Sequence, residues 1–274
     1  MDNKKRFDKI AESIKSIKIQ GARNIAKSAL FAYSLIPTPE SKKKLLSLRP
    51  TEPMLEKVLE LSGKKSYTEI LSHFDFSQKL INKGVINLIK NNEVIFTHCH
   101  STNVVNSLIF AHKNKKTFQV YNTETRPLFQ GRKTSKALKR AGIKVTMFID
   151  SAIATAIEKD NLKDKIYANK IFLGADALLK EGIINKVGSK AISELAFYNK
   201  IPVYIIADSW KFTSKNISIE NRSLNEVWDN APKKIKIKNP AFEFVSRKYI
   251  TGIITEYGLM KYSEFVKKMK SLKI

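Results

Sequence analysis

The segment EVIFTHCHSTNVVNSLIFAHK, residues 93–113, decides the fold of this chain. It begins with a short apolar run, passes through a polar turn, and continues with apolar residues three and four positions apart. Such a run bounded by turn residues is typical of a buried strand, and the spacing after it is typical of an amphipathic helix. The segment therefore predicts a strand that leads directly into a helix, with His98, Cys99 and His100 at the junction.

The same pattern recurs to the end of the chain. Further strands are predicted in TFQVYNTE (117–124), KVTMFID (144–150), KIFLGAD (170–176), IPVYIIAD (201–208) and ITGIITE (250–256). Helical spacing is found in TSKALKRAG (134–142), SAIATAIEKD (151–160), SKAISELAFYNK (189–200) and YSEFVKKMKSLK (262–273). Strands that alternate with helices form a mainly parallel sheet with helices on both faces. We predict an α/β protein whose residues 92–274 form a doubly wound, Rossmann-like domain.

Residues 1–91 follow a helical pattern throughout. Apolar residues recur at helical spacing in FDKIAESIKSIKI (7–19), ARNIAKSALFAYSLI (22–36) and SYTEILSHFDFSQKLINKGVINLIK (66–90). The breaks fall at PTPES and RPTEP, where proline restricts the preceding residue and ends helices. We predict a helical N-terminal domain over residues 1–91.

The composition predicts a soluble globular protein. The 274 residues are 43% hydrophobic, which is enough for a full core, and no apolar run reaches the ~18 residues needed to cross a membrane. The first twenty residues are charged throughout and do not resemble a signal peptide. The single cysteine, Cys99, cannot form an internal disulfide, which fits a reducing compartment. A cytoplasmic location is expected.

The net charge of +25 comes from 50 basic and 25 acidic residues. A field of this strength attracts polyanions, so nucleic acid, the translation machinery and phosphorylated substrates are all permitted partners. Because the lysines are spread along the chain, a solvated basic surface and a dedicated polyanion-binding face both stay open. The sequence contains no GxGxxG and no GxxxxGK[ST], so the common dinucleotide and P-loop sites lack their phosphate-binding glycines.

Ligands of doubly wound sheets bind beyond the carboxyl ends of the strands. Acidic residues recur at those predicted ends, which suggests one crevice with several titratable groups. Asp150 is expected to do no more than cap the helix that follows it. The acidic residues are Glu124, Asp150, Asp176, Asp208 and Glu256.

Cys99 and its flanking histidines allow two kinds of site. Strand alternation would place His98 and His100 on one side and Cys99 on the other, and a structural zinc site needs four N or S ligands. We therefore predict no metal here. Ser101 or Thr102 is expected to cap a helix beside the thiol, and a helix N-terminus lowers the pKa of a cysteine. The alternative is a buried, inert thiol.

A second segment, GADALLKEGIINKVGSKA (174–191), has glycines at 174, 182 and 188. These glycines follow a predicted strand, lie in a turn and precede a helix. The backbone N–H groups at the start of that helix could hold an anion. A purely structural turn fits the same pattern.

Six blocks together carry a family resemblance: THCHS, TETRPLFQGRKTSKAL, VTMFIDSA, GADALLKEGIINKVGSKA, IIADSWKF and NPAFEFVSRKYITGIITEYG. They resemble the superfamily that joins methylthioribose 1-phosphate isomerase, archaeal ribose 1,5-bisphosphate isomerase and the regulatory subunits of the guanine-nucleotide exchange factor of translation initiation. The likeness to the ribose 1,5-bisphosphate isomerases is the strongest. In the isomerases a cysteine and an aspartate form a pair that the translation subunits typically lack, and Cys99 and Asp176 match it. The resemblance implies that Cys99 accepts a proton and Asp176 donates one.

The resemblance also implies which residues bind the substrate. Arg49 in SLRPTEP, the pair Asn185 and Lys186 in INKVG, and Lys211 in SWKF match family positions. The isomerases carry an Arg-Gly-Ala-Gly loop between their first helices. This chain has Gln20, Gly21, Ala22 and Arg23 there, so the loop lacks its first arginine and carries another where the last glycine stands.

The leading hypothesis is an isomerase that converts ribose 1,5-bisphosphate to ribulose 1,5-bisphosphate. The resemblance implies a phosphorylated pentose substrate, no metal or organic cofactor, and a homo-oligomer built from dimers. The first alternative is a non-catalytic regulatory protein like the translation-factor subunits, for which the basic charge would serve an RNA-linked partner. The second is methylthioribose 1-phosphate isomerase, which would need a more apolar pocket.

Overall fold

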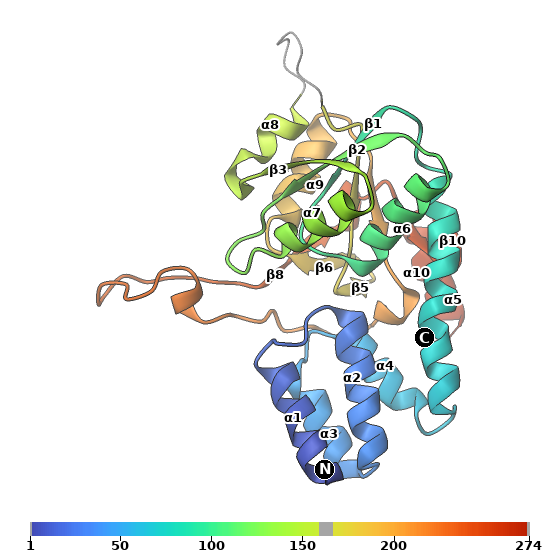
Figure 1. Cartoon of the computed structure of the whole chain (residues 1–274), viewed down its shortest axis with the longest axis vertical. Coiled ribbons are helices and arrows are strands. Elements are labelled where there is room, and N and C mark those ends of the chain that lie inside the picture. Colours follow the sequence, from blue (N-terminus) through green and yellow to red (C-terminus); the bar gives the residue numbers. More distant parts are fainter. Residues whose placement is uncertain (1, 159–166, 273–274) are drawn as a thin grey trace.

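The computed structural model describes residues 2–158 and 167–272. A bundle of short helices forms one end of the molecule and a layered sheet domain forms the other, while the long helix α5 (Tyr67–Ile86) runs alongside both (Figure 1). Helices cover both faces of the sheet, and the α/β fold predicted from the sequence is confirmed.

The central sheet has seven strands in the order β10-β9-β7-β4-β1-β2-β3. All neighbouring pairs are parallel except β9 and β10, so the carboxyl ends of the other strands share one edge. Each predicted strand contains an observed one, whereas β10 and the strands of a second, antiparallel sheet (β5-β6-β8) were not predicted as strands. The strands are β1 (Glu93–Thr97), β2 (Phe118–Thr123), β3 (Lys144–Phe148), β4 (Lys170–Leu173), β5 (Ala177–Leu179), β6 (Gly182–Lys186), β7 (Val203–Ile206), β8 (Phe242–Ser246), β9 (Gly252–Thr255) and β10 (Gly258–Met260).

Two apolar layers fix the helices to the sheet. One face of the sheet, with side chains such as Ile95, is covered by α5, α6 (Thr102–Lys113) and α7 (Gln130–Arg140). The other face, with side chains such as Phe96, is covered by α8 (Ile153–Ile157), α9 (Ser189–Tyr198) and α10 (Tyr262–Ser271). The alternation of side chains along each strand produces this division. The helix predicted over 151–160 is shorter than expected, because a 3-10 turn precedes α8, and positions 159 and 160 lie outside the described residues.

The N-terminal helices enclose a core of their own. They are α1 (Asn3–Lys15), α2 (Ala22–Leu35), α3 (Pro39–Leu48) and α4 (Pro53–Leu61), with the first half of α5 packed against them. Pro39 and Pro53 begin helices here, because the first turn needs no N–H donor from proline. Since α5 contributes Phe74 to this core and Ile81 to the sheet domain, the boundary at residue 91 stays a prediction.

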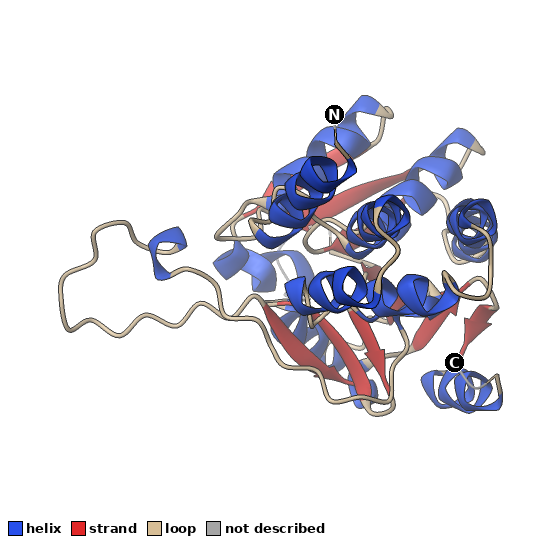
Figure 2. Cartoon of the chain, turned by 90° about the horizontal axis from the view of Figure 1, so that it is seen from below, coloured by secondary structure: helices blue, strands red, loops and turns tan. Residues whose placement is uncertain are grey.

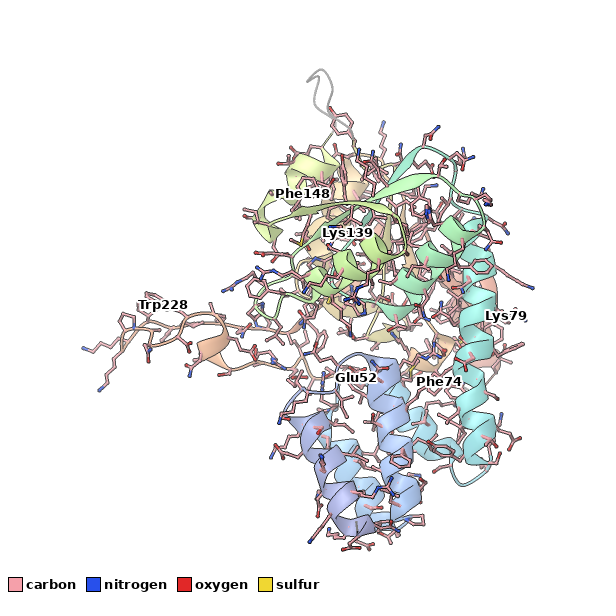
Figure 3. All side chains as sticks on the ribbon, viewed as in Figure 1. Glu52, Phe74, Lys79, Lys139, Phe148 and Trp228 are labelled. Atoms are coloured by element: carbon pink, nitrogen blue, oxygen red, sulfur yellow. The ribbon has the colours of Figure 1, made fainter. Side chains whose placement is uncertain are left out.

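A long arm, residues 213–240, leaves the body between β7 and β8 and returns beside its own start (Figures 1 and 2). Backbone hydrogen bonds from Ala241 to Glu220 and from Arg222 to Asn239 close its base. Trp228 lies on the arm far from the body (Figure 3). Among the described helices, none has both the length and the apolar character needed to cross a membrane.

Candidate active site

One pocket lies between the carboxyl edge of the central sheet and the N-terminal helices. The carboxyl ends of β1 and β4 form one wall, and the loops before α2 and α4 form the other. All ten site residues predicted from the sequence line it: Gln20, Gly21, Ala22, Arg23, Arg49, Cys99, Asp176, Asn185, Lys186 and Lys211.

Cys99 lies in a left-handed turn beyond the end of β1. The strand ends at Thr97, and Cys99 has φ 65°, with its N–H donating to Thr125 Oγ1 at 3.0 Å. Strand alternation therefore does not extend to this residue. The expectation that the two histidines and the cysteine point to opposite sides is wrong, because His98, Cys99 and His100 all line the pocket.

The two histidines hold the walls of the pocket in place. The carbonyl of Val187 can only accept, so His98 donates to it through Nε2–H at 2.8 Å, and His98 Nδ1 accepts from Thr123 Oγ1 at 2.6 Å. His100 Nδ1 lies 2.9 Å from Thr134 Oγ1, which donates to the carbonyl of Cys99 at 2.8 Å. Burial lowers the pKa of each ring to about 4, so both are neutral at pH 7.

The thiol of Cys99 is protonated in the unliganded protein. As predicted, Ser101 caps α6 beside it, accepting from the N–H of Val104 at 3.4 Å. Burial nevertheless raises the pKa of Cys99 to about 11, although the nearby Lys186 opposes the rise. The expectation of a lowered cysteine pKa is wrong here, because desolvation outweighs the helix end and the lysine.

Asp176 follows β4, and its backbone N–H donates to the carbonyl of Ile184 at 2.9 Å. Burial raises the pKa of its carboxyl group, although Lys211, Lys186 and Arg49 act in the opposite direction. The ammonium of Lys211 also donates to the carbonyl of Ala175, next to Asp176. A carboxyl group with a raised pKa can serve as a proton donor.

Arg49 lies between two glutamates that the sequence did not single out. Its Nη2 is 3.6 Å from Glu52 Oε1, and its Nε is 3.3 Å from Oε2 of Glu220, at the base of the arm. Burial, and then the charge of Asp176, raise the pKa of Glu52 to about 8. Glu52 stands within the RPTEP motif and could have been noticed there, whereas the segment around Glu220 has no such signal.

The loop Gln20–Arg23 supplies a helix N-terminus to the pocket. Gly21, with φ 84°, precedes Ala22, the first residue of α2. Arg23 is paired with Asp75 of α5, and its guanidinium carbon lies 5.6 Å from the centre of the Phe74 ring. Arg23, which stands where the related isomerases have a glycine, therefore directs its guanidinium group to two residues of α5.

The helix start at Gly188 is a structural turn. Its N–H and that of Lys190 both donate to Glu243 Oε1, at 2.7 and 2.8 Å, which fills the place expected for an anion. Asp150 also differs from expectation. Its carboxylate accepts from the N–H groups of Thr125 and Arg126, at 2.9 and 2.7 Å, and holds the loop after β2 instead of capping its own helix.

The fold and the site define an α/β protein with a pocket at the edge of the sheet, lined by a thiol, a carboxyl group and several cations. Residues 42–262 match the Initiation factor 2 subunit family, and the chain belongs to that family. The superfamily resemblance read from the six sequence blocks is thereby confirmed.

Known proteins of this family include enzymes and translation factors. The chain is 34% identical to a protein of Methanocaldococcus jannaschii named ribose 1,5-bisphosphate isomerase, over 91% of this chain and 89% of the relative. It is similar in fold to the structure of the Pyrococcus horikoshii OT3 translation initiation factor eIF-2B, with TM-score 0.78 and 24% identity over 93% of this chain and 97% of the other. It is also similar in fold to 5-methylthioribose 1-phosphate isomerase from Pyrococcus horikoshii OT3, with TM-score 0.77 and 22% identity over 97% and 88%.

Proposed function

We propose that this protein is an aldose–ketose isomerase that converts ribose 1,5-bisphosphate to ribulose 1,5-bisphosphate. The observation that carries the proposal is the meeting of Cys99 and Asp176 in one enclosed pocket with Lys186 and Lys211. Relatives that cover most of the chain and are named for this reaction support the choice of substrate.

The reaction needs an acid and a base on either side of the sugar. Asp176 gives its proton to the ring oxygen as the bond from that oxygen to carbon 1 breaks. The Cys99 thiolate takes the proton from carbon 2, and the released electron pair forms a double bond between carbons 1 and 2. The product of this half is an open-chain enol phosphate, with Cys99 protonated and Asp176 ionised.

The second half restores both groups. Asp176 takes the proton of the carbon 2 hydroxyl as the ketone forms, and Cys99 returns its proton to carbon 1. No atom or electron is left over. The buried carboxyl group of Asp176, with its raised pKa, suits the donation of a proton to the ring oxygen. Cys99 must first lose its own proton before it can act as the base at carbon 2.

Lys186, Lys211 and the N-terminus of α2 are the groups that would attract the phosphates. Lysine binds phosphate as a point charge, and the first N–H groups of a helix bind it through their dipoles. Asn185 supports this wall from within, since its amide donates to Ser189 Oγ at 2.8 Å. Gln20 offers an amide where the related isomerases have an arginine.

The regulatory alternative draws its support from this altered loop and from the fold of the translation factors. A purely regulatory protein would have no need for a titratable pair inside a closed pocket, which favours the enzyme. The resemblance further predicts a homo-oligomer built from dimers, and the composition predicts a cytoplasmic location. Light scattering on the purified protein would measure the number of subunits.

The deciding experiment is incubation of the purified protein with ribose 1,5-bisphosphate while ribulose 1,5-bisphosphate is measured. We expect turnover by the wild type, and a loss of about 10²- to 10⁴-fold in kcat for Cys99→Ser and for Asp176→Asn. The matched control is Ser47→Ala, on the exposed side of α3. No turnover by the wild type, or full activity in Cys99→Ser, would refute the proposal. Turnover only of methylthioribose 1-phosphate would favour the second alternative.

A further inference from the structure

Around Arg49 two buried polar atoms have neither a hydrogen-bond nor an ion-pair partner within the described residues, Nη1 of Arg49 and Oε2 of Glu52. Nε of Arg49 and Oε2 of Glu220 lie 3.3 Å apart as an ion pair, but they do not form a hydrogen bond. Arg49 is 7% exposed and Glu52 is 3% exposed, and all three residues line the pocket of Cys99 and Asp176. Figure 3 shows Glu52 between the helical end and the sheet domain.

Buried polar groups are normally paired, and a set left unpaired in a pocket indicates what the ligand must supply. Donors and acceptors stand side by side here. A phosphate group offers only acceptors and negative charge, so it would satisfy the arginine but leave the carboxylate of Glu220 without a donor. A hydroxyl group both donates and accepts, so it can bind the arginine and a carboxylate at once.

The charges around Arg49 favour the same ligand. The charge of Arg49 is already balanced in part by Glu220, whose Oε2 lies 3.3 Å from Arg49 Nε. The groups that face Glu52 are Arg49, Asp176, Lys211 and Glu220, and burial raises its pKa to about 8. At pH 7 Glu52 therefore carries a proton that it can donate, while Glu220 supplies the acceptor.

We propose that Arg49, Glu52 and Glu220 form a hydroxyl-binding subsite, which recognises the hydroxyl groups of the sugar and leaves the phosphates to Lys186, Lys211 and the α2 N-terminus. The subsite rests on the proposed function for the identity of the sugar. It assigns Arg49 to the hydroxyls, where the family resemblance implied only a general role in substrate binding. It also gives the base of the arm a part in specificity, because Glu220 comes from that segment.

Calorimetric titration of the full-length protein tests the subsite. Cys99→Ser serves as the background so that the ligand is not consumed, and the two probes are ribose 1,5-bisphosphate and inorganic phosphate. We expect Glu52→Ala and Glu220→Ala to weaken the sugar bisphosphate at least about tenfold, the loss expected for one hydrogen bond to a charged group. The affinity for inorganic phosphate should stay constant in Glu52→Ala, which removes a neutral group at pH 7, and stay constant or rise in Glu220→Ala, which removes a negative charge. The control is Glu60→Gln, an exposed residue of α4, the helix that Glu52 precedes.

A change of equal factor and sign for both probes would overturn the subsite, because the glutamates would then only neutralise Arg49. Since Glu52→Ala leaves a cavity, a second measurement uses the ligand instead. The 2-deoxy and 3-deoxy analogues are titrated against the protein with Glu52 and Glu220 intact, and at least one should bind at least about tenfold more weakly than the parent. Equal binding of all three sugars would overturn the proposal.

The two proposals fail separately. Binding of ribose 1,5-bisphosphate without conversion by the wild type would refute the isomerase and leave the subsite standing. Conversion by Glu52→Ala and Glu220→Ala with an unchanged KM would refute the subsite and leave the isomerase standing.

Discussion

At the scale of single residues, the pocket holds three acids whose pKa values burial has shifted the same way. The thiol of Cys99 and the carboxyl groups of Asp176 and Glu52 all keep their protons more strongly than in water. Catalysis needs the thiol ionised while Asp176 is protonated, and in the unliganded protein that combination is a minor state. The rate should therefore rise with pH through ionisation of Cys99 and fall through ionisation of the carboxyl groups.

Alkylation of Cys99 by iodoacetamide measures the first of these ionisations. Cys99 is the chain's only cysteine, so the signal is unambiguous. Because the thiolate is the nucleophile and its pKa is raised to about 11, the rate should climb about tenfold per pH unit beyond the ordinary cysteine value of about 8.5. Lys186→Met should slow the reaction at each pH, because the lysine favours the thiolate. A rate that levels off at about pH 8.5 would contradict the burial argument.

The residues of this pocket were partly predictable from the sequence. Cys99 and Asp176 follow strands of a parallel sheet, so topology alone brings them to one edge. Arg23 could not be placed, since its partner Asp75 lies on a helix 52 positions away. Glu220 could not be predicted either, because it lies at the base of a long arm that carries no periodic signal.

At the scale of elements, α7 is held against β2 by the absence of a side chain. A Cβ atom on Gly131 would lie 1.7 Å from the carbonyl oxygen of Thr123. With any larger residue at position 131, α7 could not stay this close to β2. The start of α7 follows the loop after β2, which Asp150 holds beside the pocket.

Gly131→Ala should accordingly destabilise the protein by at least about 1–3 kcal/mol, the usual cost of forcing extra atoms into a packed site. Urea unfolding measures the loss. Gly63→Ala is the control, because a Cβ there meets no atom of the described chain within 4 Å. Equal stability of the two variants would show that α7 can shift away from β2.

A second pair of elements is joined by His73 of α5 and Asp208, which follows β7. His73 Nε2 lies 3.0 and 3.1 Å from the two carboxylate oxygens of Asp208, and its ring stacks on Trp210 at 3.5 Å. Trp210 precedes Lys211, so this contact anchors the short turn that presents a lysine to the pocket. Burial alone would raise the pKa of Asp208, but the bonds from His73, Ser77 and the Trp210 N–H lower it overall.

His73→Phe keeps the ring stack and removes the bonds to Asp208. Unfolding free energy should fall by about 1.5–3 kcal/mol at neutral pH, since a buried carboxylate loses a donor. Because the pKa of Asp208 is lowered from 3.8 in the folded protein, its stabilising contribution is present at neutral pH and disappears as the pH falls below that value. The loss of unfolding free energy caused by His73→Phe should therefore become smaller over the same pH range. In a double-mutant cycle with Asp208→Asn, strictly additive losses would contradict a direct bond.

The strands and helices themselves followed from apolar periodicity, whereas short or irregular elements did not. β5 and β6 lie in a segment whose glycines predict only a turn between a strand and a helix, and β10 has three residues. The prolines at 39 and 53 mark boundaries in the sequence, but they begin α3 and α4 rather than only ending the helices before them. The sequence pattern identifies where one helix ends and the next begins. Because the N–H groups of the first turn need no partner within the helix, each proline stands at the start of the following helix.

At the scale of the whole molecule, the net charge of +25 extends into the pocket, whose lining has more basic than acidic residues. Arg49, Lys186 and Lys211 line it together with Glu52, Asp176 and Glu220, and most of the other lysines are exposed. Such a field raises the local concentration of phosphorylated ligands near the pocket. It would also attract nucleic acid, and both uses of the charge considered from the sequence stay open.

The pocket lies between two separately packed cores, and this arrangement makes a prediction about ligand binding. Arg49 and the α2 N-terminus belong to the helical core, whereas Cys99, Asp176 and Lys186 belong to the sheet domain. A sugar bisphosphate that contacts both sides should stabilise the whole chain by about 2.7 kcal/mol at a concentration of 100 Kd. Hydrogen exchange on Cys99→Ser, which cannot consume the ligand, should show slower exchange in α2 and α4 as well as at the start of α6. Glu60→Gln in the same background is the control, since its ligand contacts are intact. Protection confined to the sheet domain would show that the helical core takes no part in binding, and would contradict the placement of Arg49 and Glu52 against the sugar.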